Sequence, residues 1–253
     1  MKQLQDITLY YPNQGEEAKR FTSKQNIISD LYVHFLDGYK PPKTSRISII
    51  LSHSDDIKGY AGSILTVNAK FDESFFWNQS DRDQNKIILD TIHRVTALCA
   101  KEFNWDLRIF ENAYNRVVEA NFTFKIELPA KLSRNRKYKA SILVEKNEKA
   151  ALIFALFFNN QNELIKKVEL LNTFNWSGFY KQLVKKYKWF DNSSFGLSIH
   201  KDQLIIKADL DEEKQVVLIN PIGNTKEEIE GTLRQIIFND FNSEKEKINW
   251  MNS

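Results

Sequence analysis

The chain has 253 residues, of which 42% are hydrophobic and 13% aromatic, enough apolar material for one large domain or two of ordinary size. Its 36 basic and 33 acidic residues give a net charge of +3, which predicts no long-range attraction to nucleic acid or to membranes. The small numbers of glycines and prolines, 8 and 5, disfavour a glycine-rich cofactor binder and a proline-rich linker.

Three features predict a protein of the reducing cytoplasm that does not bind a membrane. The single cysteine, Cys99, cannot form an intramolecular disulfide, and no Cys-x-x-Cys pattern for zinc is present. The first six residues are polar and lack the apolar stretch of a signal peptide. The longest apolar run, residues 150–158, is too short to span a bilayer.

The first part of the chain is dominated by patterns typical of strands. Residues 46–52 and 63–71 carry closely spaced aliphatic side chains and are separated by a connection that contains Gly59 and Gly62. Two further segments, residues 7–11 and 31–36, are also rich in aliphatic and aromatic residues and are predicted as strands. The sequence therefore predicts a sheet near the start of the chain.

Two helices should follow this sheet. Ser80 and Asp83 resemble a capping box, and apolar residues at helical spacing from Ile88 to Cys99 predict a helix over residues 81–102. Asp106 is a suitable cap for the second helix. The alternation of apolar and polar residues over 121–128 then predicts another strand.

Residues 129–137 are the most polar segment in mid-chain and the best candidate for a domain boundary. We therefore predict an N-terminal domain over 1–129 and a C-terminal domain over 138–253, with a single domain as the alternative. The fold class expected for both is α+β, with mainly antiparallel sheets and helices packed on one face.

The second half should contain an antiparallel meander followed by a helix and further strands. Thr225 should cap a last helix. The predicted segments are strands at 138–145, 150–158, 164–171, 195–200, 203–209 and 215–219, and helices at 177–188 and after residue 225.

The segment 174–190 has the most unusual composition, because aromatic residues alternate with lysines. On a helix, the lysines at spacings i, i+4 and i+7 would form one stripe, and exposed aromatics beside them could dock into a protein partner. Stacking on nucleic-acid bases is a second interpretation, and an ordinary amphipathic helix with a solvated lysine face is a third. The candidate binding residues are Trp176, Tyr187, Trp189, Lys181, Lys185 and Lys188.

A second cluster lies just after a predicted strand, at His53, Asp55 and Asp56. A histidine beside two carboxylates can perform acid–base chemistry or bind a metal, although a polar turn explains the same residues. His93 and Cys99 lie six positions apart on the predicted helix and should point to different sides, so Cys99 is interpreted as a buried structural thiol.

Established catalytic signatures are missing from the sequence. It has no glycine-rich phosphate loop, no Gly-x-Ser-x-Gly elbow and no His-Glu-x-x-His motif. We therefore assign no catalytic residue, no metal ligand and no cofactor. The leading hypothesis is a non-catalytic cytosolic protein-binding protein, such as an inhibitor or immunity-type protein that neutralises a toxin enzyme. The alternatives are an enzyme with an unrecognised hydrolytic site and a nucleic-acid-binding protein.

Overall fold

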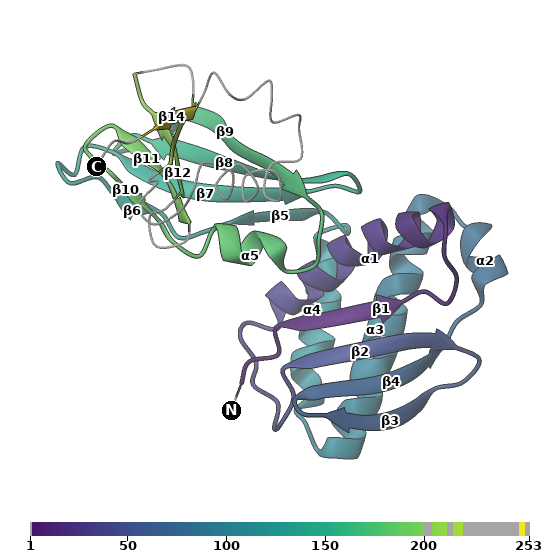
Figure 1. The fold of residues 1–253 in the computed structure, drawn as a ribbon. Helices are drawn as coiled ribbons and strands as arrows, with labels where there is room; N and C mark the ends of the chain where they lie inside the picture. Colours follow the sequence, from purple (N-terminus) through teal and green to yellow (C-terminus); the bar gives the residue numbers. More distant parts are fainter. Residues whose placement is uncertain (1, 200–203, 212–214, 220–247, 251–253) are drawn as a thin grey trace. The chain divides into compact units, whose positions relative to one another are not determined.

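The computed structural model describes residues 2–199, 204–211, 215–219 and 248–250. It confirms an α+β fold in which antiparallel strand pairs predominate (Figure 1). The chain divides into two compact units. Unit 1 comprises Met1–Phe124 and Trp176–Gly178, and unit 2 comprises Lys125–Asn175 and Phe179–Ser253.

Unit 1 is built on a four-stranded sheet with the order β1-β2-β4-β3. Strands β1, β2 and β4 run parallel to one another, and only β3 is antiparallel to its neighbour. The helix α1 joins β1 to β2, as a parallel connection requires. The bounds are β1 Asp6–Tyr10, α1 Glu16–Phe35, β2 Arg46–Ser52, β3 Asp56–Ala61 and β4 Ile64–Lys70.

Alternating side chains of this sheet point into the core of unit 1. In β2 the inward residues are Ile47, Ile49 and Leu51, and β1 and β4 follow the same alternation. Two further helices of unit 1 are α3 Asp81–Phe103 and α4 Leu107–Glu119. The helices α1, α3 and α4 contact one another and cover that face, and in Figure 1 α3 and α4 lie behind the strands. The short helix α2 spans Glu73–Trp77.

The prediction of a strand at residues 31–36 is wrong, because these residues form the end of α1. Every residue from Ile28 to Val33 is buried, including Ser29 and Asp30, and the helix contacts β1, α3 and α4. An element buried on all sides shows no amphipathic period, so its apolar run resembles a buried strand. Gly15 is the N-cap residue of this helix, and it has no side chain that could have marked the helix start in the sequence.

The helix starts at Ser80 and Asp106 are confirmed. The Ser80 hydroxyl accepts a hydrogen bond from the Asp83 amide, and the Asp106 carboxylate accepts one from the Arg108 amide. The helix predicted after Thr225 lies outside the described residues.

The described residues of unit 2 form two sheets. In the first, β7, β8 and β9 form the predicted antiparallel meander, β5 pairs with the edge of β7, and the short β6 also pairs with β7. The second has the order β10-β11-β12-β13-β14, antiparallel except for the last pair. The bounds are β5 Phe124–Glu127, β6 Lys131–Leu132, β7 Lys139–Lys146, β8 Ala150–Phe158, β9 Leu164–Phe174, β10 Tyr187–Trp189, β11 Ser194–Ile199, β12 Leu204–Asp209, β13 Gln215–Ile219 and β14 Ile248–Trp250.

The prediction of one helix over residues 177–188 is also wrong. The helix α5 covers only Phe179–Leu183, and Tyr187–Trp189 is the strand β10. Trp189 pairs with Phe195 across the antiparallel ladder with β11, and the two rings contact each other at a centroid distance of 5.3 Å. Cross-strand aromatic packing of this kind favours a strand over the helix that the lysine spacing indicated.

The chain passes from unit 1 to unit 2 between residues 124 and 125 and returns briefly to unit 1 at Trp176–Gly178. The polar segment that we predicted as a boundary, 129–137, lies within unit 2 and contains β6. In the return segment, the Gly178 amide donates to the buried carboxylate of Asp30 at 2.9 Å.

Among the described residues, no helix has the length and the hydropathy needed to cross a membrane.

Candidate functional site

A cavity of about 390 Å³ opens in unit 1 at the end of the sheet where β1, β2 and β4 all terminate. The carboxyl ends of parallel strands are a frequent place for ligand sites, because loops diverge there and leave a crevice. Its volume lies within the usual range of ligand pockets, about 300–1,000 Å³. The lining residues are Pro12, Leu51, Ser52, His53, Lys70, Phe71, Asp72, Glu73 and Ser74.

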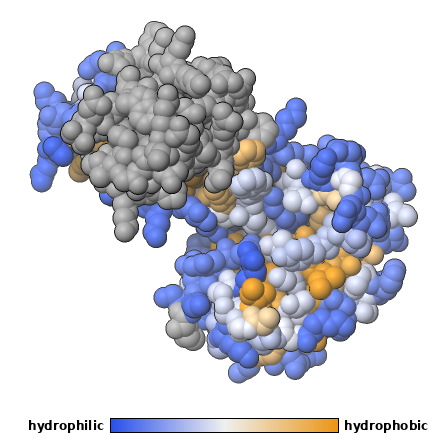
Figure 2. Space-filling view, viewed as in Figure 1, coloured by the Kyte–Doolittle hydropathy of each residue, from blue (hydrophilic) through white to orange (hydrophobic). Residues whose placement is uncertain are grey.

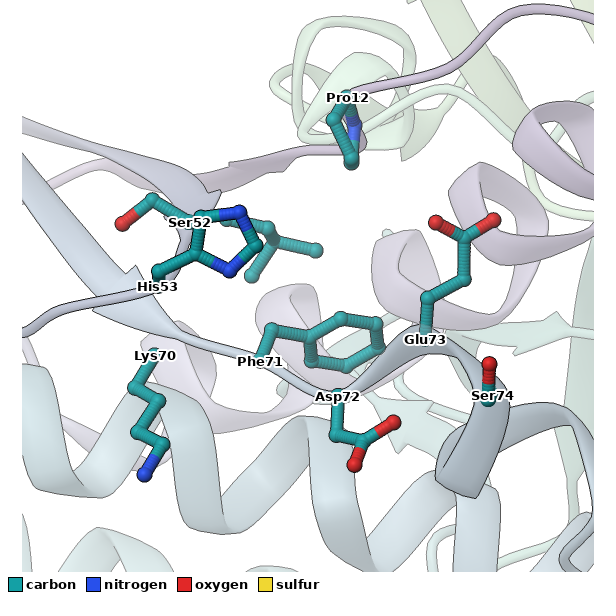
Figure 3. A pocket seen from close by; sticks show the side chains of 9 residues that line it. Pro12, Ser52, His53, Lys70, Phe71, Asp72, Glu73 and Ser74 are labelled. Carbon is teal, nitrogen blue, oxygen red and sulfur yellow. The ribbon is translucent and has the colours of Figure 1, made fainter.

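The lining of this cavity combines apolar side chains, those of Pro12, Leu51 and Phe71, with polar ones. Figure 3 shows the Phe71 ring between the His53 imidazole and the Glu73 carboxylate, with Pro12 opposite the ring. The side chains of Lys70 and Asp72 point away from this space. Of the two carboxylates in the lining, Glu73 is therefore the one that extends alongside the Phe71 ring.

The Glu73 carboxylate is held by a chain of hydrogen bonds. Oε1 accepts from the Tyr11 hydroxyl at 2.5 Å, and the Asn13 side-chain amide donates to Oε1 at 3.0 Å and to Oε2 at 2.9 Å. The Trp77 indole N–H in turn donates to the Tyr11 hydroxyl at 2.8 Å. These contacts fix the position of Glu73 from both the loop after β1 and the helix α2.

This network also affects the ionisation of Tyr11. Burial is the larger cause and the hydrogen bond to the Glu73 carboxylate the next, and together they raise the pKa of the Tyr11 hydroxyl to about 12. Tyr11 therefore stays protonated at neutral pH and remains a hydrogen-bond donor to Glu73.

The hydrogen bonds leave part of Glu73 available to a ligand. Each carboxylate oxygen accepts about two hydrogen bonds, and from the residues that the structure describes Oε2 receives one, that from Asn13. Among the described residues, no lysine or arginine forms an ion pair with Glu73. The site thus presents an oriented negative charge beside an apolar surface.

The predicted cluster of His53, Asp55 and Asp56 does not converge on the cavity. His53 lines it, but Asp55 forms an ion pair with Arg94 and accepts a hydrogen bond from the Lys70 amide. Asp56 forms an ion pair with Lys58 at 2.6 Å, which lowers the pKa of the Asp56 carboxyl. The two carboxylates therefore fasten β3 and its turn, as the polar-turn interpretation expects.

The three aromatic candidates from the segment 174–190 have different environments. Trp176 is 53% exposed, whereas Trp189 is only 8% exposed and its indole N–H donates to the Lys131 carbonyl at 2.8 Å. The Tyr187 hydroxyl donates to the Pro129 carbonyl at 3.0 Å. Tyr187 and Trp189 thus hold the residues around β6 within unit 2, and Trp176 alone of the three is largely accessible.

The lysine candidates do not form a helical stripe. Lys181 lies in α5, Lys185 follows this helix, and Lys188 lies in the strand β10. Lys185 is exposed, and Lys181 and Lys188 are partly buried. A different basic residue of unit 2, Lys131, lies 4.0 Å from the centre of the Tyr187 ring.

The interpretation of Cys99 as a buried structural thiol is supported. The side chain lies in the core of unit 1, and burial raises the pKa of the Cys99 thiol to about 12. Within the described ranges, no group of three His, Cys, Asp or Glu side chains is arranged to hold a metal ion.

Sequence reasoning missed Tyr11, Asn13, Glu73 and Trp77 as parts of one site. Their only common signal is position, because they follow strands β1 and β4 that lie in parallel in one sheet.

No protein-family model, no curated protein and no solved structure gives a significant match to this chain.

Proposed function

We propose that this chain is a non-catalytic protein-binding protein that docks its partner on the open face of the unit 1 sheet. The observation that supports it is an uncovered set of parallel strands. Parallel strands are normally covered on both faces, yet the described helices of unit 1 that pack on this sheet contact one another on the same side.

The composition of the open face suits a protein interface. The central row across the four strands is uncharged and small, and consists of Thr8, Ser48, Thr66 and Gly59. Charged residues of this face lie at its margins, where Asp6 pairs with Arg46 at 2.6 Å at one end and Asp56 pairs with Lys58 at 2.6 Å on the edge strand β3. Interface centres are depleted in charged residues, whereas their margins are polar.

Two large side chains stand next to the central row. Tyr10 and Ile50 are register partners on β1 and β2 and are 47% and 42% exposed. Figure 2 shows hydrophobic residues of unit 1 surrounded by hydrophilic ones in this view. An aromatic and an aliphatic side chain exposed side by side on a sheet face can provide the apolar centre of a docking surface.

Photo-crosslinking tests this proposal directly. A photoreactive residue replaces Ile50 in one variant and Val118 in another, because Val118 is a comparably exposed apolar residue on α4, at 41%. We expect a specific crosslinked protein from position 50 and none from position 118.

The crosslinked protein must then bind the purified chain in solution. Ile50→Lys should weaken this binding at least about tenfold, which corresponds to about 1.4 kcal/mol, and Val118→Lys should not. Equal effects of the two substitutions, or the same crosslinks from both positions, would exclude the open face as the docking surface.

The specific form of this proposal is an inhibitor or immunity-type protein that neutralises a toxin enzyme. It requires that the captured protein be an enzyme whose activity falls when this chain is added in equimolar amount. Wild-type protein should inhibit it, and the Ile50→Lys variant should require a higher concentration for the same inhibition.

A further inference from the structure

The cavity between His53 and Glu73 adjoins the open sheet face. Ser52 and Lys70 are register partners at the end of β2 and β4, and both also line the cavity. A partner protein bound over Tyr10 and Ile50 would therefore place one of its own side chains next to or inside the cavity. This continuity links the cavity to the docking surface and rests on the proposed function.

We propose that this cavity receives one basic side chain, a lysine or an arginine, from the protein partner. Glu73 provides the negative charge, and its Oε2 has capacity for one more hydrogen bond. Phe71, Leu51 and Pro12 provide the apolar surface for the methylene groups of such a side chain. The volume, about 390 Å³, accommodates a single long side chain with water around its charged end.

The Glu73 carboxylate is also held in position before any ligand binds. Three hydrogen bonds from Tyr11 and Asn13 hold a group that could otherwise rotate freely in solvent, and Trp77 holds Tyr11. A carboxylate that is already oriented loses less conformational entropy when a cation binds. An ordinary surface glutamate needs no such support.

Nuclear magnetic resonance on the full chain tests the proposal without the partner. The probes are N-acetyl-arginine methylamide and N-acetyl-lysine methylamide, with the uncharged citrulline and norleucine analogues as controls. We expect a basic probe to shift the amide signals of Leu51, Phe71 and Glu73 in a saturable manner, and the uncharged analogues to leave them unchanged. The two basic probes distinguish a guanidinium from an ammonium as the preferred head group.

Two Glu→Gln variants provide the matched comparison. Glu73→Gln removes the charge in the cavity and should weaken probe binding at least about tenfold, the effect expected for a hydrogen bond to a charged group. Glu119→Gln makes the same change on the exposed end of α4 and should leave binding within about twofold of wild type. Equal binding of charged and uncharged probes to wild type would overturn the proposal, even if Glu73→Gln disturbs α2.

The partner identified by crosslinking provides the last step. Glu73→Gln should weaken its binding, and Glu119→Gln should not. If Ile50→Lys weakens partner binding but Glu73→Gln does not, the sheet face is the docking surface and the cavity is not part of it. If the basic probes bind at Glu73 but position 50 captures no partner, the cavity is a cation site and the proposed function fails.

Discussion

Two groups of aromatic residues, one in each unit, donate hydrogen bonds from their side chains to acceptors of different kinds. In unit 2, Tyr187 and Trp189 donate to the backbone carbonyls of Pro129 and Lys131, so their polar atoms are satisfied within the unit. In unit 1, Trp77 donates to Tyr11 and Tyr11 donates to Glu73, so the chain of hydrogen bonds ends on a charged group.

The difference lies in the last acceptor. A backbone carbonyl at the end of such a chain is neutral and belongs to the structure that it stabilises. The Glu73 carboxylate carries a charge, lines a cavity and keeps capacity on Oε2. Aromatic residues with polar atoms therefore fasten segments in both units, but only the group in unit 1 also orients a group that can bind something else.

The largest effect should come from Trp189, whose ring contacts Phe157 and Phe195 in the core of unit 2. Trp189→Ala should lower the free energy of unfolding by about 3–5 kcal/mol, because it leaves a cavity. Trp189→Phe keeps most of the ring contact and loses the hydrogen bond to Lys131. Urea denaturation followed by far-ultraviolet circular dichroism measures both.

Trp189→Phe should cost less than Trp189→Ala in that experiment. A change below about 1 kcal/mol for Trp189→Ala would contradict the structural role of this residue. Loss of partner binding by a stably folded Trp189→Ala protein would restore the first interpretation, in which Trp189 is a recognition anchor.

A matched pair of Tyr→Phe substitutions compares the two groups directly. Tyr11→Phe removes the acceptor of Trp77 and a donor to Glu73, and should lower the free energy of unfolding by about 1–2 kcal/mol. Tyr187→Phe removes one hydrogen bond that lies at the surface and should cost less than about 1 kcal/mol, because water can replace it.

Urea midpoints of the two variants, measured under the same conditions, give the comparison. Equal losses of stability would mean that the network around Glu73 is no more constrained than the contact in unit 2. Tyr11→Phe should in addition weaken binding of the basic probes, since Glu73 is then less well oriented.

The sequence predicted those elements whose apolar residues alternate or recur in a regular way. The strands at 46–52 and 150–158 were predicted with the bounds that the structure has, because buried apolar side chains recur along the whole length of each strand. The starts of α3 and α4 were predicted from Ser80 and Asp106, whose side chains make the expected caps. Local signals of this kind need no knowledge of distant partners.

Elements that depend on distant partners were not predictable. The helix α1 is buried by β1, α3 and α4, and its polar residues Gln25, Ser29 and Asp30 are held by hydrogen bonds from other parts of unit 1 or within the helix. Its C-terminal half therefore lacks a polar face. The site around Glu73 also depends on strand order, which brings together the residues after β1 and β4 although about 60 positions separate them in sequence.

The smallest expected effect is on the pH dependence of stability, and it concerns His93, a polar residue of α3 that lies away from the site at Glu73. His93 Nδ1 lies 3.3 Å from the Tyr32 hydroxyl, and its ring packs against Tyr114. Burial lowers the pKa of His93 from its ordinary value of 6.5, although Glu111 and Asp90 nearby act in the opposite direction. The unfolded chain therefore binds a proton at this residue more readily than the folded chain does.

The sign of the pH dependence follows from that difference. As the pH falls below about 6.5, protonation of His93 in the unfolded chain favours unfolding, so the folded protein loses stability. His93→Gln should remove this contribution, so its urea midpoint should fall less than that of wild type between about pH 7.5 and about pH 5.5. An identical fall in both proteins would show that His93 does not couple protonation to folding, and that another group causes the acid sensitivity of unit 1.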